Sequence, residues 1–169
     1  MTQRRISTEQ NTSTYFLTMT IQRWYYLFDR HNRWEILADS LRYCQTNKGL
    51  EINGYVFMLN HLHMIATALD MVGFVRDFKK FTSKKFKLNL EQTEPTVLQL
   101  FMDEATGAYQ FWKKDNGPKI IESPAFYLQK LNYIHNNPVR KGYVARPEHW
   151  IWSSANPDSP LKVKFLEGF

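Results

Sequence analysis

The stretch 51–69 constrains the fold more than any other part of the chain, because two apolar runs are separated there by a single residue. Residues 51–59 and 61–69 are rich in aliphatic and aromatic side chains, and Asn60 between them tolerates the backbone geometry of a tight turn. This pattern predicts two antiparallel strands joined as a hairpin. An antiparallel sheet is therefore expected to be part of the fold.

The second strand of this hairpin carries two histidines on one face. Side chains in a strand alternate between the two faces of the sheet, so residues two apart point the same way. Leu62, Met64 and Ala66 would face the core, and His61 and His63 would then share the opposite face. Two imidazoles placed in this way can bind one metal ion.

The remaining segments add helices and further strands around the hairpin. Alternating apolar and polar residues predict a strand over 15–22, and helical spacing predicts helices over 32–49 and 72–88. The segment 91–107 reads as an insertion with a short helix over 96–103, and short strands are expected over 109–113 and 119–121.

A last helix is expected from Ser123 to about Asn136. Ser123 can cap it, and Pro124 suits the first helical position. Pro138 disfavours helical geometry at the preceding residue, which would place Asn137 at the C-terminal end of the helix.

The composition favours a basic intracellular protein. The chain has 22 Lys and Arg against 16 Asp and Glu, a net charge of +6, which favours polyanionic partners. Cys44 is the only cysteine, so neither an intramolecular disulfide nor a Cys-rich zinc module is expected. The chain has no secretory leader pattern and no apolar run long enough to span a bilayer. We therefore expect a soluble, cytoplasmic protein with no membrane partner.

The histidine pair needs a third ligand to form a metal site. Asn137 could supply a neutral oxygen donor beside His61 and His63. Such a set suits Mn²⁺ and can bind Mg²⁺ with water and phosphate oxygens, whereas zinc stays open because imidazole suits it. The alternative is that the two histidines are a structural pair, exposed or hydrogen-bonded, without a metal.

Tyr133 is a candidate nucleophile on the last helix. Its spacing from Lys130 and Asn137 places all three on one helical face, apart from the apolar stripe that contains Tyr127 and Ile134. A cation one turn away favours the phenolate that a tyrosine nucleophile needs. The competing interpretation is that Tyr133 belongs to the core, as most helical tyrosines in an aromatic-rich chain do.

Two further features could contact a nucleic acid. The predicted helix over 72–88 is amphipathic and basic, and its cations could contact phosphates, although simple solvation is the usual role of such a face. Its candidate DNA-binding residues are Arg76, Lys80, Lys84 and Lys87. Exposed aromatic residues could stack on unpaired bases, although packing is their commoner role, and the candidates are Trp24, Tyr25, Tyr26 and Trp112.

Two long motifs resemble those of a known family. Residues 54–63 read Gly-Tyr-Val-Phe-Met-Leu-Asn-His-Leu-His, and residues 133–142 read Tyr-Ile-His-Asn-Asn-Pro-Val-Arg-Lys-Gly. With the segment 147–154, they resemble the signatures of the single-tyrosine HUH transposases, in particular the REP-associated tyrosine transposases. The resemblance spans about residues 15–155. Three segments depart from the family pattern, namely Leu59 in place of a proline, residues 91–108 and residues 111–115.

The resemblance implies a specific chemistry. His61, His63 and Asn137 would hold Mg²⁺ or Mn²⁺, and Tyr133 would attack a phosphate of single-stranded DNA near a hairpin. The product would be a 5′-phosphotyrosine with a free 3′-OH, which permits later rejoining. Lys130 matches a lysine often found before the tyrosine and would help to orient or activate it.

We therefore expect an α+β domain that cleaves and rejoins single-stranded DNA. Its antiparallel sheet would have four to five strands with helices packed on one face, in a ferredoxin-like or RRM-like order. The domain would cover residues 15–155, between a polar arm at 1–14 and a tail at 156–169, and would act as a monomer or homodimer. Two alternatives remain, namely a non-catalytic RNA- or DNA-binding sheet domain and a metal-dependent hydrolase that uses bound water.

Overall fold

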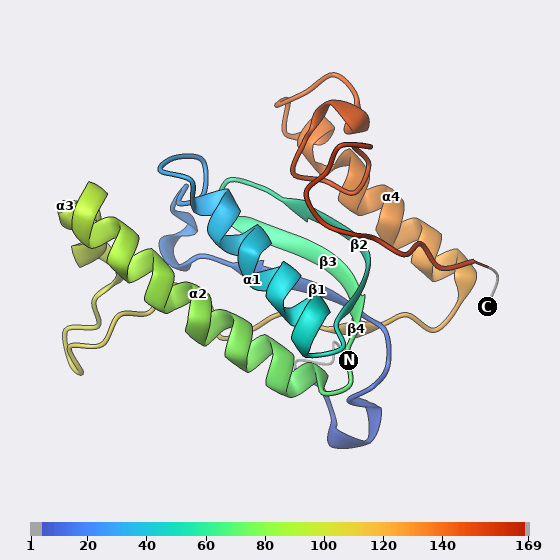
Figure 1. The fold of residues 1–169 in the computed structure, drawn as a ribbon, viewed down its shortest axis with the longest axis horizontal. Helices are drawn as coiled ribbons and strands as arrows, with labels where there is room; N and C mark the ends of the chain where they lie inside the picture. Colours follow the sequence, from blue (N-terminus) through green and yellow to red (C-terminus); the bar gives the residue numbers. More distant parts are fainter. Residues whose placement is uncertain (1–4, 168–169) are drawn as a thin grey trace.

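The computed structural model describes residues 5–167, which form a four-stranded antiparallel sheet with helices around it (Figure 1). The strands are β1 (Tyr15–Thr20), β2 (Glu51–Phe57), β3 (His61–Thr67) and β4 (Lys119–Ile120). The helices are α1 (Arg33–Asn47), α2 (Met71–Thr93), α3 (Pro95–Leu98) and α4 (Pro124–Arg140). Short 3-10 helices cover Thr8–Gln10, Gln22–Trp24, Gln99–Phe101 and Pro147–His149. The predicted α+β class is confirmed.

The strand order is that of a ferredoxin-like sheet. It reads β2-β3-β1-β4, so the β1–α1–β2 and β3–α2–β4 connections each pass over one intervening strand. The predicted hairpin is β2–β3, in which Phe57 pairs with Leu62. Strand β1 pairs with β3 so that Thr18 lies opposite His63 and Thr20 opposite His61. This register fixes the neighbours of both histidines.

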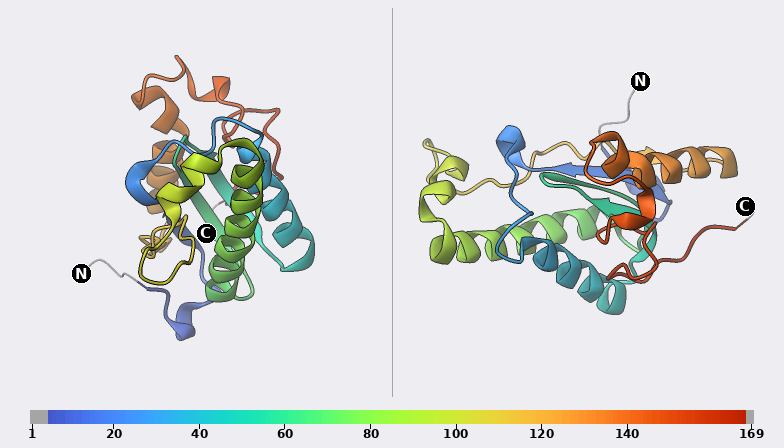
Figure 2. Two further views of the ribbon diagram at one scale, coloured as in Figure 1. Left: turned by 90° about the vertical axis from the view of Figure 1, so that its left-hand side faces the viewer. Right: turned by 90° about the horizontal axis from the view of Figure 1, so that it is seen from above.

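Helices cover both faces of the sheet (Figure 2). Helices α1 and α2 lie on one face, where Leu62 and Met64 of β3 enter the larger core. Helix α4 lies on the other face, where Ile65 of β3 packs with Tyr127 and Ile134 of α4. The sheet was expected to carry helices on one face. A second layer forms because the α4 face of the sheet also presents buried apolar side chains, which must be removed from water.

Helix α4 continues past the end that Pro138 was expected to impose. It runs to Arg140, because an internal proline removes only one backbone donor when its neighbours keep helical geometry. Two residues beyond its end lies Gly142, which has a φ of 75°. The Gly142 N–H donates to the Val139 carbonyl and the Tyr143 N–H to the Pro138 carbonyl, which are the two bonds of a glycine C-cap.

The segment predicted as a strand over 109–113 is irregular instead. It borders β1 through the single bridge between Ile21 and Trp112. This isolated bridge is not extended into the repeated backbone pairing of a strand, although Phe111 and Trp112 are both buried. The prediction of a strand there was wrong for that reason.

The C-terminal segment runs along the outer edge of β2. The Phe57 N–H donates to the Trp152 carbonyl, and the Ser154 N–H donates to the Tyr55 carbonyl. Farther along, the Lys164 N–H donates to the Ile52 carbonyl. The residues after 155 that are described thus pack against the sheet.

Candidate active site

The two histidines of β3 lie side by side on the face of the sheet that α4 covers. Their ring centroids are 4.9 Å apart. Each ring uses its Nδ1 atom for a hydrogen bond, His61 with Asn60 Oδ1 at 2.7 Å and His63 with Thr18 Oγ1 at 2.8 Å. With Nδ1 engaged in both rings, the Nε2 atoms remain for a further ligand.

Asn60 fixes the tautomer of His61. The Asn60 Nδ2 group donates to the Trp24 carbonyl at 2.8 Å, and a carbonyl can only accept, so the orientation of the amide is determined. Its Oδ1 atom, also only an acceptor, therefore faces His61, and His61 Nδ1 must carry the proton. The lone pair of His61 is then on Nε2, as a metal ligand requires.

Burial keeps both imidazoles neutral at neutral pH. Desolvation, with a smaller contribution from the charge of Lys141, lowers the pKa of His61 to about 4. Desolvation, followed by the charges of His61, Arg140 and Lys130, lowers the pKa of His63 to about 3. Only the neutral form of histidine can bind a metal ion, so the pair is in its ligating form.

Tyr133 of α4 lies directly over His63. Their ring centroids are 5.2 Å apart, and Phe16 completes a cluster of three rings at 6.1 Å from Tyr133 and 5.5 Å from His63. The Tyr133 side chain is still 37% exposed, so a large substrate can reach it. The structure therefore brings the predicted nucleophile to the two predicted histidine ligands within a single chain.

Two cations flank the Tyr133 ring. Arg140 has its guanidinium carbon 4.3 Å from the ring centroid, and Lys130 has its Nζ 5.7 Å from it. Lys130 also lies 4.9 Å from the centroid of the Phe16 ring, and burial lowers its pKa. Positive charge beside the ring favours an anionic substrate.

Asn137 is the third predicted ligand and lies one turn after Tyr133. It is only 3% exposed, yet its carboxamide has no hydrogen-bond partner within residues 5–167. Neither polar atom of this amide is among the fully buried side-chain atoms of residues 5–167 that lack a partner, so the amide stays within reach of a ligand. A mixed set of two imidazoles and one amide oxygen fits Mn²⁺ or Mg²⁺, whose coordination is completed by water or phosphate oxygens.

The donor set is poorly suited to a zinc site built from the usual protein ligands. Across residues 5–167, no group of three or more His, Cys, Asp or Glu side chains could hold a metal ion. Catalytic zinc sites normally have three such ligands. The amide of Asn137 is therefore needed if a metal binds here.

The basic residues predicted to bind DNA lie elsewhere. Arg76, Lys80, Lys84 and Lys87 are on α2, which packs on the face of the sheet opposite to α4. Arg76 is paired with Asp77. The structure therefore does not bring these cations to the histidines and Tyr133.

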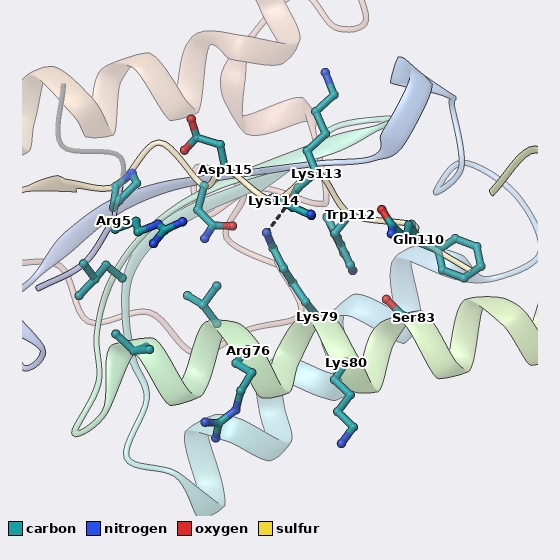
Figure 3. A pocket seen from close by; sticks show the side chains of 16 residues that line it. Arg5, Arg76, Lys79, Lys80, Ser83, Gln110, Trp112, Lys113, Lys114 and Asp115 are labelled. Atoms are coloured by element: carbon teal, nitrogen blue, oxygen red, sulfur yellow. Dashed lines mark hydrogen bonds between the residues drawn. The ribbon is translucent and has the colours of Figure 1, made fainter. Parts of the chain in front are cut away.

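A cavity of about 760 Å³ adjoins α2 and the segment 110–118 (Figure 3). Lys79 extends into it and donates to the Lys113 carbonyl at 2.7 Å, and desolvation lowers the pKa of Lys79 to about 8. Arg76 and Lys80 point away from it. This cavity contains none of the residues of the candidate active site.

Three residues of the site were not predicted from the sequence. Arg140 lies seven residues after Tyr133, a helical spacing, but the helix was expected to end before it. Asn60 precedes His61 directly, although nothing in the sequence shows that its amide is held by Trp24. Thr18 could be found only from the register of β1 against β3.

Comparisons with known proteins identify the fold. The chain shares its fold with a solved transposase structure. The structure of a REP-associated tyrosine transposase bound to a REP hairpin matches 90% of this chain and 81% of its own chain, with a TM-score of 0.66 and 21% sequence identity. No protein-family profile and no curated protein sequence matches the chain. No helix within residues 5–167 is both long and apolar enough to cross a membrane.

Proposed function

We propose that this protein is a single-tyrosine HUH transposase of the REP-associated branch, which cleaves and rejoins single-stranded DNA near hairpins. The observation that carries this proposal is the contact of Tyr133 with His63, beside His61 and within the same chain. The shared fold supports it, because the similar structure is that of a transposase bound to a REP hairpin. The net charge of +6 also favours a polyanionic substrate.

The proposed ligands of a divalent metal are His61, His63 and Asn137. Bound Mg²⁺ or Mn²⁺ would act as a Lewis acid that polarises the scissile phosphate. The chain contributes the positions of its donors, since Thr18 and Asn60 orient the two imidazoles through their Nδ1 atoms.

In the proposed reaction, the Tyr133 oxygen attacks the phosphorus atom of a DNA phosphodiester. The bond from phosphorus to the tyrosine oxygen forms and the bond to the 3′ oxygen breaks, while the phenol loses a proton and the 3′ oxygen gains one. Lys130 and Arg140, which lie beside the Tyr133 ring, balance the charge of the phosphate. The 5′-phosphotyrosine retains the energy of the phosphodiester, so attack by a 3′-OH can reverse the step.

The decisive test is the replacement of Tyr133 by Phe. A labelled hairpin oligonucleotide with unpaired flanks, incubated with the wild-type protein and Mn²⁺ or Mg²⁺, should give a covalent adduct on a denaturing gel. Tyr133→Phe should give none, because the attacking oxygen is absent, while the shape of the ring is kept. Tyr43→Phe, at an exposed position on α1, is the matched control and should retain the adduct.

Two outcomes would contradict this proposal. Cleavage that persists in Tyr133→Phe without any adduct would indicate a hydrolase that uses bound water. DNA binding without cleavage by the wild-type protein, at any concentration of Mn²⁺ or Mg²⁺, would indicate a non-catalytic DNA-binding domain.

A further inference from the structure

The turn that follows β1 exposes two large aromatic side chains. Trp24 is 60% exposed and Tyr26 is 50% exposed, although rings of this size are usually buried in part or in full. Tyr25 between them packs against Phe101, with ring centroids 5.8 Å apart. The Tyr25 side chain thus anchors the turn, and the Trp24 and Tyr26 side chains are exposed to solvent.

The backbone of this turn is held in an uncommon conformation. Arg23 has a φ of 59° and Trp24 a φ of 55°, values that residues other than glycine rarely adopt. The Trp24 carbonyl accepts a hydrogen bond from Asn60 Nδ2 at 2.8 Å. Such conformations persist where surrounding contacts impose them, and they cluster at binding sites.

Asn60 also places the turn beside the candidate active site. The same side chain that holds the Trp24 carbonyl pairs through Oδ1 with His61 Nδ1 at 2.7 Å. The Asn60 amide therefore contacts both the exposed turn and a proposed metal ligand. A pocket of about 550 Å³ lies at this turn and is lined by Arg23, Trp24, Tyr25, Tyr26, Arg30 and Asn60.

Positive charge surrounds the exposed rings. The Lys113 Nζ lies 3.6 Å from the centroid of the Trp24 ring and covers one of its faces. Neither Lys113 nor Arg23 forms an ion pair with any residue in 5–167, whereas Arg30 is paired with Asp29. Aromatic faces beside unpaired cations are the combination that binds single strands, because bases stack on the rings and phosphates meet the cations.

We propose that Trp24 and Tyr26 form a stacking platform for unpaired nucleotides of the DNA strand next to the scissile phosphate. Arg23 and Lys113 contact the phosphates of these nucleotides. This inference rests on the proposed function and adds to it the place where the unpaired part of the substrate is held. Stacking tolerates any base, so the platform positions the strand without reading its sequence.

The test measures binding to hairpins that differ only in their flank. One hairpin carries a flank of four unpaired thymidines, a second has the same flank with abasic nucleotides, and a third has no flank. Fluorescence anisotropy is recorded in EDTA, so that no cleavage contributes. Trp24→Ala should bind the thymidine-flanked hairpin about 5- to 100-fold more weakly than wild type, and Trp24→Phe should recover much of the loss.

The abasic flank separates stacking from a general loss of structure. It should weaken binding of the wild-type protein more than that of Trp24→Ala, because only the Tyr26 ring is left to stack on bases in the variant. Tyr43→Ala, which removes an equally exposed ring from α1, should bind all three hairpins as wild type does. Thermal unfolding of each variant, followed by circular dichroism, shows whether the fold is retained.

Equal binding of the thymidine-flanked hairpin by wild type and Trp24→Ala would overturn the platform while leaving the proposed function intact. A loss in Trp24→Ala of the same size for all three hairpins would overturn it as well. Absence of binding by the wild-type protein to every hairpin would instead contradict the proposed function itself.

Discussion

At the scale of single residues, the site depends on which nitrogen of each imidazole carries the proton. Both rings are neutral, with His63 buried and His61 partly buried, so a metal ion would displace no proton at neutral pH. Asn60 and Thr18 occupy the Nδ1 atoms and leave Nε2 free. These two neutral side chains therefore orient the ligating imidazoles, as carboxylates do in many other metal sites.

Replacing Asn60 by Ala should weaken metal binding. The substitution removes the acceptor that holds the proton on His61 Nδ1, so the ring can rotate or change tautomer. We expect the affinity for Mn²⁺ to fall about 10- to 100-fold in isothermal titration calorimetry. Asn47→Ala, at the exposed end of α1, should leave the affinity unchanged, and an unaltered affinity in Asn60→Ala would show that this bond does not orient the ligand.

At the scale of elements, a fully buried guanidinium joins α1 to the end of α2. Arg33 begins α1 and donates to Asn89, Thr93 and Glu94 near the end of α2, with 2.7 Å to Glu94. It also donates to the Leu27 carbonyl at 3.2 Å. The planar fork of arginine can make all these bonds at once, which the single ammonium of lysine cannot.

Arg33→Ala should be strongly destabilising for that reason. Loss of the guanidinium leaves the Leu27 carbonyl without this partner and Glu94 with only its longer contacts to Arg30 and His31. Removal of one side of such a buried group costs about 3 kcal/mol or more. Urea denaturation should show the decrease in the free energy of unfolding, and Arg33→Lys should recover little of it. Arg42→Ala, whose partners on α1 are exposed, is the control and should cost less than about 1 kcal/mol.

The sequence predicted elements well where they follow a simple period and less well where tertiary contacts override it. The β2–β3 hairpin and the alternation of β1 were readable because each strand has one regular pattern. The end of α4 was not, since the glycine cap at Gly142 outweighs the local preference of Pro138. The irregular segment around Phe111 and Trp112 likewise depends on packing that no local pattern reveals.

At the scale of the whole molecule, one chain contains every residue of the candidate site. Tyr133 and Lys130 come from α4, and His61 and His63 come from β3 of the same chain. The sequence predicted that these groups have related roles, but only the fold shows that they meet without a second copy. Residues that complete the site from other strands, such as Thr18, depend on register and were therefore beyond reach of the sequence.

A mixture of two inactive variants should consequently stay inactive. His63→Ala lacks a metal ligand and Tyr133→Phe lacks the nucleophile, and each chain keeps its own defect if the site is built in one chain. The adduct formed by an equimolar mixture should equal the background of the separate variants on a denaturing gel. Restored adduct would instead mean that the helix of one copy serves the histidines of another.

The C-terminal segment along β2 keeps copies of this protein from pairing through that edge of the sheet. A bare outer strand offers unpaired backbone groups to any similar strand, which is how sheets join into fibres. Here the carbonyl of Trp152 and the N–H of Ser154 already occupy that border. A protease that removed the last twenty or so residues would uncover it, and the trimmed molecules would then tend to aggregate by continuing one sheet into the next.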